Sequence, residues 1–161
     1  MHRMGVAALA CAAILAGGTA LDAGAADLKD FAGVWTIRSS TVAPWKDPKS
    51  PLGAKEPGQL IGRTVTFEAD AVRGPPPIGC KKPVYKVETV GPDMIFEGQL
   101  AEPREYAKNP DPVASATKLA FADPRHIVTL DAGCTELQFH VVSPGTLAFG
   151  LDNRVYLMTR K

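Results

Sequence analysis

Hydrophobic and polar residues alternate along most of the last forty residues of the chain. Leu137, Phe139 and Val141 alternate with Glu136, Gln138 and His140, and the same period of two continues in the segments that follow. This period is typical of strands with one buried face. Turn sequences, Pro144-Gly145 and Asp152-Asn153, separate these segments. The pattern predicts a four-stranded antiparallel meander over residues 126–130, 135–142, 146–151 and 154–160.

Four earlier segments are rich in β-branched and aromatic residues, as strands are: 33–41, 60–68, 84–90 and 94–99. Eight strands are enough for an antiparallel sheet to close into a barrel. We therefore predict an all-β fold, an eight-stranded antiparallel barrel closed by the last strand against the first. A β-sandwich of the same strands is the alternative. Residues 102–108 and 113–120 predict one or two short helices.

Two long loops, residues 44–58 and 70–79, are rich in proline. Long loops on a rigid scaffold often carry function. In the first loop Trp45 lies between Pro44 and Lys46, and an exposed aromatic residue is typical of an interface anchor. We predict that Trp45 and Lys46 bind a partner. The competing interpretation, given equal weight, is that Trp45 caps the mouth of the barrel.

The first 25 residues have the features of a signal peptide. A short basic start precedes an apolar run over residues 5–16 and the small residues Ala23-Gly24-Ala25. We place cleavage after Ala25, with Ala26 as the alternative, which leaves residues 26–161 as a single β-barrel domain. The run is too short for a membrane span. A lipoprotein would need Cys11 as the residue that carries the lipid, but Cys11 lies inside the apolar run. We therefore predict a periplasmic or secreted protein without membrane insertion.

Removal of this segment leaves two cysteines, Cys80 and Cys134. An even pair in an exported protein predicts a disulfide. In the chain-entropy model a loop of this length stabilises the fold by about 4 kcal/mol. A metal-binding or redox pair is the alternative, but the chain has no Cys-x-x-Cys motif.

Phe31-x-Gly33-x-Trp35 in the first strand, eight strands and an arginine at the end of the last strand resemble the calycin superfamily. This group includes the lipocalins and small bacterial secreted metalloprotease inhibitors. The resemblance implies a barrel closed by a cation–π contact between Trp35 and Arg160, or Arg154 in another register. Such a contact contributes about 0.5–2 kcal/mol. The inhibitors also carry one disulfide, but their chains are shorter and lack these long proline-rich loops.

Charge and motifs argue against several functions. The 18 Lys and Arg residues nearly balance the 17 Asp and Glu residues, which disfavours binding to nucleic acid. The chain has no Gly-x-Ser-x-Gly motif and no phosphate-binding glycine loop, so we predict neither an enzyme nor a cofactor. His126 and His140, with Asp123 or Glu136, would supply metal ligands. Because His140 alternates with polar residues, we predict that it lies on a solvated face and that there is no metal site.

Two functions remain. The first is an exported protein that engages or inhibits another exported protein through its proline-rich loops, and we favour it because of Trp45. The alternative is a carrier of a small apolar ligand inside the barrel, which would need small inward residues. The inward positions of the last strands are bulky, and this predicts a filled interior.

Overall fold

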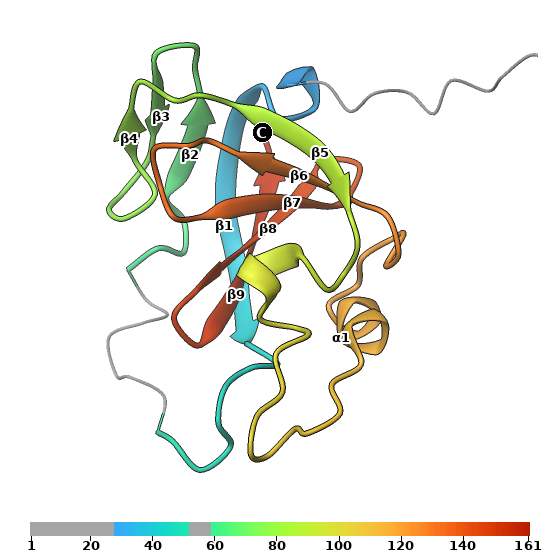
Figure 1. The fold of residues 1–161 in the computed structure, drawn as a ribbon. Helices are drawn as coiled ribbons and strands as arrows, with labels where there is room; N and C mark the ends of the chain where they lie inside the picture. Colours follow the sequence, from blue (N-terminus) through green and yellow to red (C-terminus); the bar gives the residue numbers. More distant parts are fainter. Residues whose placement is uncertain (1–27, 52–58) are drawn as a thin grey trace, which may run out of the picture.

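The structure is a computed structural model that describes residues 28–51 and 59–161. The predicted signal peptide and its cleavage position lie outside the described residues. The elements (Figure 1) are η1 (Leu28–Asp30), β1 (Gly33–Val42), β2 (Thr64–Phe67), β3 (Ala71–Arg73), β4 (Cys80–Lys81), β5 (Lys86–Val90), η2 (Ile95–Gly98), α1 (Pro112–Lys118), β6 (Ile127–Asp131), β7 (Gln138–Ser143), β8 (Thr146–Leu151) and β9 (Arg154–Arg160), where η marks a 3-10 helix.

The strands form one antiparallel sheet in the order β4-β3-β2-β1-β9-β8-β7-β6-β5, and this sheet curls into a half-barrel (Figure 1). The first and last strands pair in its middle, with Trp35 opposite Arg160 and Val42 opposite Arg154. An all-β, antiparallel, barrel-like fold is therefore confirmed. The predicted meander is also present, as β6 to β9.

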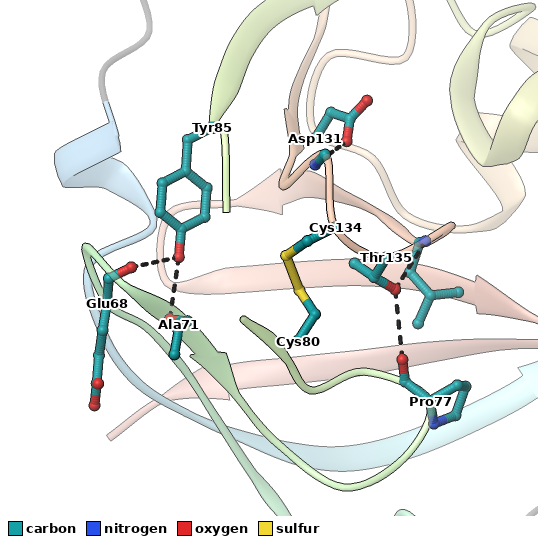
Figure 2. Close-up of a disulfide and its surroundings, with 10 residues drawn as sticks. Glu68, Ala71, Pro77, Cys80, Tyr85, Asp131, Cys134 and Thr135 are labelled. Atoms are coloured by element: carbon teal, nitrogen blue, oxygen red, sulfur yellow. Dashed lines mark hydrogen bonds between the residues drawn. A yellow bond between two sulfur atoms is a disulfide. The ribbon is translucent and has the colours of Figure 1, made fainter. Parts of the chain in front are cut away.

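The half-barrel is open between its edge strands, β4 and β5, and a disulfide and side-chain hydrogen bonds bridge the opening (Figure 2). Cys80 and Cys134 form the predicted disulfide, with their Cα atoms 5.8 Å apart. The Tyr85 hydroxyl, just before β5, lies 2.7 Å from the carbonyl oxygen of Glu68 and 3.3 Å from that of Ala71. A covalent bond and side-chain hydrogen bonds thus join the two sides of the sheet that strand pairing leaves apart.

One face of the sheet carries a core of aromatic rings. Phe67 of β2 and Phe139 of β7 have ring centroids 4.8 Å apart, although β1, β9 and β8 lie between their strands. Such a contact requires the two strands to meet across the hollow of the curled sheet, so this is the inner face. Phe149 lies 5.9 Å from Phe139 and stacks on Tyr156 at 5.1 Å. These rings occupy the inside of the half-barrel.

Trp35 joins the first strand to this inner core. Its side chain is 1% exposed, and its indole N–H donates to the Phe31 carbonyl at 2.7 Å. The guanidinium of Arg160 lies 4.7 Å from the ring centroid, the cation–π contact expected of this pair. Arg154, the other candidate, instead donates to the Ser40 hydroxyl at 2.9 Å. The contact locks the start of β1 to the end of β9.

The opposite, outer face of β7, β8 and β9 is also buried. An apolar cluster covers it, with Phe96 from η2, Ala116 from α1 and Phe121 from the chain that follows α1. Within β8 the side chains alternate between the faces, since Phe149 belongs to the inner core and Ala148 to the outer cluster. The central strands are therefore covered on both sides, by the curled sheet itself and by mostly irregular chain.

The strand predicted over residues 94–99 is wrong, because this segment forms η2. Phe96 and Glu97 both have left-handed backbone conformations, with φ of 51° and 58°. Ile95 and Phe96 are both buried in the outer cluster, whereas neighbours in a strand point to opposite faces. Two consecutive apolar side chains can enter one cluster only if the chain turns.

The helix predicted over residues 102–108 is also wrong. The Arg104 guanidinium holds the carbonyls of Gln99 and Glu102, at 2.9 and 2.8 Å, and Arg104 forms an isolated antiparallel bridge with Ala107. Those carbonyls are thus bound to a side chain and not to helical N–H groups. The second predicted helix is confirmed as α1, and its first turn is capped by a 2.9 Å hydrogen bond from the Ala114 N–H to the Asp111 carboxylate.

The strand count also differs from eight. The loop predicted over residues 70–79 contains β3 and leads into β4, which pairs with it, and the strand predicted over residues 60–68 is shortened to β2. The sheet in the described chain therefore has nine strands.

Candidate functional site

A pocket of about 330 Å³ opens where the loop after β1, η2, the start of β7 and the β8–β9 turn meet. We call it the Trp45 pocket. Its volume lies at the small end of the range for ligand sites. Its described lining residues are Trp45, Phe96, Glu97, Gln99, Glu136, Leu137, Gln138, Gly150, Leu151 and Asp152.

Trp45 is held in place as one wall of this pocket. Its indole N–H donates to the Asp152 carbonyl at 2.9 Å, and its ring lies 5.2 Å from that of Phe96 at 44°. The Tyr106 hydroxyl donates to the Trp45 carbonyl. Gly150 lies beneath both rings, where a Cβ atom would come within 3.1 Å of each. The absence of a side chain at residue 150 therefore lets both rings lie against the sheet.

The opposite wall, η2, rests on a buried histidine. The Phe96 N–H donates to Nε2 of His140 at 3.1 Å, and Nδ1 lies 2.9 Å from the Thr129 hydroxyl. Because a backbone N–H can only donate, Nε2 is unprotonated and Nδ1 carries the ring proton. Burial lowers the pKa of His140 to about 3, so the ring is neutral.

The prediction that His140 faces solvent is wrong, because its side chain is 0% exposed. Its strand does alternate as the sequence indicates. However, the face that carries His140 is covered by η2, whose Phe96 ring meets the imidazole edge-to-face at 4.6 Å. Alternation distinguishes two faces of a strand but does not show that either one is exposed.

The Trp45 pocket has an acidic and polar rim. Three exposed carboxylates line it, those of Glu97, Glu136 and Asp152, and no lysine, arginine or histidine is among its described lining residues. None of the three forms an ion pair with another described residue. The amide oxygen of Gln138 is buried without a hydrogen-bond partner in the described chain. The pocket thus combines two aromatic rings with unneutralised negative charge and an unused acceptor.

The two predicted partner-binding residues are placed differently. Trp45 lines the pocket and is only partly exposed, because it packs on the outer cluster. Lys46 points into its own loop, where its ammonium donates to the carbonyl of Asp47 at 2.6 Å and to that of Ser50. The structure therefore brings Trp45 to the pocket and uses Lys46 to shape the loop beside it. A partner-binding role for either residue stays a prediction.

The two histidines make separate contacts. Exposed His126 contacts Asp123 at 3.2 Å, whereas buried His140 contacts Thr129. Hydrogen bonds from the backbone N–H of Arg125, and from His126, hold the pKa of the Asp123 carboxyl below its usual range. Within residues 28–51 and 59–161, no three His, Cys, Asp or Glu side chains are grouped as metal ligands would be.

Sequence reasoning found Trp45 but missed the acidic rim. Asp152 was noted only as a turn residue, and it does adopt a left-handed conformation, with φ of 50°. Glu136 and Gln138 share the alternation of His140, whose face the sequence predicts to be solvated. Their convergence with Glu97 depends on η2, which was predicted as a strand, so the pattern contained no signal for the pocket.

Comparison of the chain with models of known protein families, with curated proteins and with solved structures gives no match. Among the helices of the described residues, none is long and apolar enough to cross a membrane.

Proposed function

We propose that the protein is an exported binding protein that engages another exported protein through the loops around the Trp45 pocket. The observation that carries this proposal is the pocket itself, which lies on the outer face among loops contributed by distant parts of the chain. Loops held on a rigid sheet are the usual location of binding sites. The disulfide between Cys80 and Cys134 supports export, because such bonds persist in oxidising compartments.

The filled inner face favours this function over transport of an apolar ligand. The contacts between Phe67, Phe139 and Phe149 continue across the inside of the half-barrel, where a carried ligand would have to lie. A lipocalin-like carrier needs small inward residues there. The contact of Trp35 with Arg160 supports the calycin resemblance, and within that group we propose the inhibitor-like rather than the carrier-like function.

The test is capture of a partner by the chain that starts at Ala26, immobilised and exposed to a periplasmic or secreted extract. A variant with Glu97→Gln, Glu136→Gln and Asp152→Asn changes the pocket rim, while Asp70→Asn changes a carboxylate in the β2–β3 turn as the control. We expect one protein to be retained by the wild type and by the control but lost by the rim variant. Equal recovery on all three would overturn the proposal.

A further inference from the structure

We infer that the Trp45 pocket binds a basic side chain, the ammonium of a lysine or the guanidinium of an arginine, presented by the partner. This inference rests on the proposed function and names the chemistry that the site recognises. It requires a cavity of suitable size, an attraction for positive charge and a surface for the alkyl chain. The pocket offers all three.

The aromatic wall supplies the first part of the recognition. Trp45 and Phe96 lie side by side at 5.2 Å, and both line the cavity. The face of an aromatic ring attracts a cation within about 6 Å of its centre, and tryptophan is the strongest of these rings. The same rings provide an apolar surface for the methylene groups of a lysine or arginine.

The rim supplies the second part. The carboxylates of Glu97, Glu136 and Asp152 come from three separate segments, η2, the loop before β7 and the β8–β9 turn. Since none is neutralised by a cation of the described chain, their negative charge is available to a ligand. Charge-assisted hydrogen bonds to carboxylates are stronger than those between neutral groups.

The side chain of Gln138 is partly buried at the wall of the pocket and adds a polar group to its lining. Its oxygen has no hydrogen-bond partner in the described chain, although buried acceptors are nearly always satisfied. The aromatic wall and the three carboxylates, and not this inaccessible oxygen, therefore carry the inference. A metal ion fits this lining less well, because the described carboxylates are not grouped as metal ligands and two aromatic rings form a wall.

The experiment titrates the wild-type chain from Ala26 onward with three small probes at low salt. These are the acetylated methylamides of lysine, arginine and norleucine, and norleucine has an alkyl chain like that of lysine but no charge. Binding is followed through the indole N–H of Trp45 by NMR, with the two indole signals assigned by Trp45→Phe. We expect saturable shifts with lysine or arginine and at least about tenfold weaker binding of norleucine.

The rim variant provides the matched test of charge. We expect the triple variant to bind the basic probes at least about tenfold more weakly, and Asp70→Asn to bind them like the wild type. Near-UV circular dichroism and the single variants show whether the fold is kept. Equal binding of norleucine, absence of a saturable shift, or undiminished binding by a folded rim variant would each overturn the inference.

The two proposals fail in different ways. If the partner is lost by the rim variant but the basic probes do not bind, the proposed function stands and the basic-side-chain inference is overturned. If the probes bind but capture of a protein does not depend on the rim, the pocket takes a free organic cation and the partner role is overturned. Displacement of the captured partner by saturating lysine probe supports both.

Discussion

The inner and outer faces of β7, β8 and β9 are both buried, but different side chains bury them. The inner face carries Phe149 and Tyr156, whose rings stack at 5.1 Å. The outer face of the same strands carries smaller side chains, among them His140, Ala148, Gly150, Val142, Val155 and Leu157. Aromatic rings fill the hollow of the sheet on one side, and on the other side Gly150 admits the rings of Trp45 and Phe96.

This difference explains why the candidate site lies on the outer face. Strands that curl around a core bring their side chains together in a regular way and leave little space. The outer face is covered by η2, a short helix and loops, whose shapes do not match the sheet everywhere, so a pocket remains between Trp45 and η2. The outer face also contains a buried polar group, His140, which stabilises η2 only while its hydrogen bonds are kept.

The largest expected effect separates the two tryptophans. Trp35→Ala should lower the free energy of unfolding by about 3–5 kcal/mol, because it empties a fully buried site and removes the ring beneath Arg160. Trp45→Ala should cost less, about 1–2 kcal/mol, because its side chain is only partly buried. Denaturant unfolding of both variants measures the difference. If Trp45→Ala proved the more destabilising, the outer cluster would be the dominant core and the comparison would be reversed.

The second effect is a loss of stability in acid that originates on the outer face. In the unfolded chain His140 binds a proton near pH 6.5, but in the folded protein it does so only near pH 3. Between these values the unfolded state binds more protons, so the free energy of unfolding falls as the pH falls, by about 1.4 kcal/mol per pH unit. We therefore expect a loss of about 2–3 kcal/mol between pH 6.5 and pH 4.5, measured by denaturant unfolding at each pH.

His140→Gln is the control for this prediction. Its side-chain oxygen can accept a hydrogen bond from the Phe96 N–H, but it does not titrate. The variant should therefore lose much less stability over the same pH range. An equal loss in both proteins would show that other groups cause the acid sensitivity. NMR of the wild type adds a direct check, since the His140 ring should stay neutral at pH 4.5.

The inner face could be predicted from the sequence, and the outer face could not, for a physical reason. Alternating bulky residues such as Leu147 and Phe149 indicate a strand and its buried side, and pairing of neighbouring strands follows from the short turns between them. What covers the other side depends on distant contacts. Phe96, in its left-handed conformation, donates its N–H to His140, which lies 44 residues further along the chain. No local pattern contains that information.

The same limit applies to the candidate site. Trp45 was identifiable because a tryptophan in a proline-rich loop is unusual on its own. Glu97, Glu136 and Asp152 are ordinary surface residues in sequence, and the turn in η2 brings Glu97 to the cavity that the other two line. The disulfide was predictable because the two cysteines have no other partner once residues 1–25 are set aside.

The smallest expected effect tests how closely the outer face is packed. In Gly150→Ala the new methyl group would lie 3.1 Å from Phe96 and 3.1 Å from Trp45, closer than side chains normally approach. Crowding costs about 1–3 kcal/mol, and the reduced freedom of the unfolded chain offsets part of this cost. We expect a net loss of about 1 kcal/mol in the free energy of unfolding and a shift of the Trp45 indole signal.

In a Trp45→Ala background the destabilisation caused by Gly150→Ala should shrink, because the space above residue 150 is then empty on one side. If Gly150→Ala stabilised the protein and left the indole signal unchanged, the rings would not press on the sheet, and the wall of the Trp45 pocket would be looser than its geometry indicates.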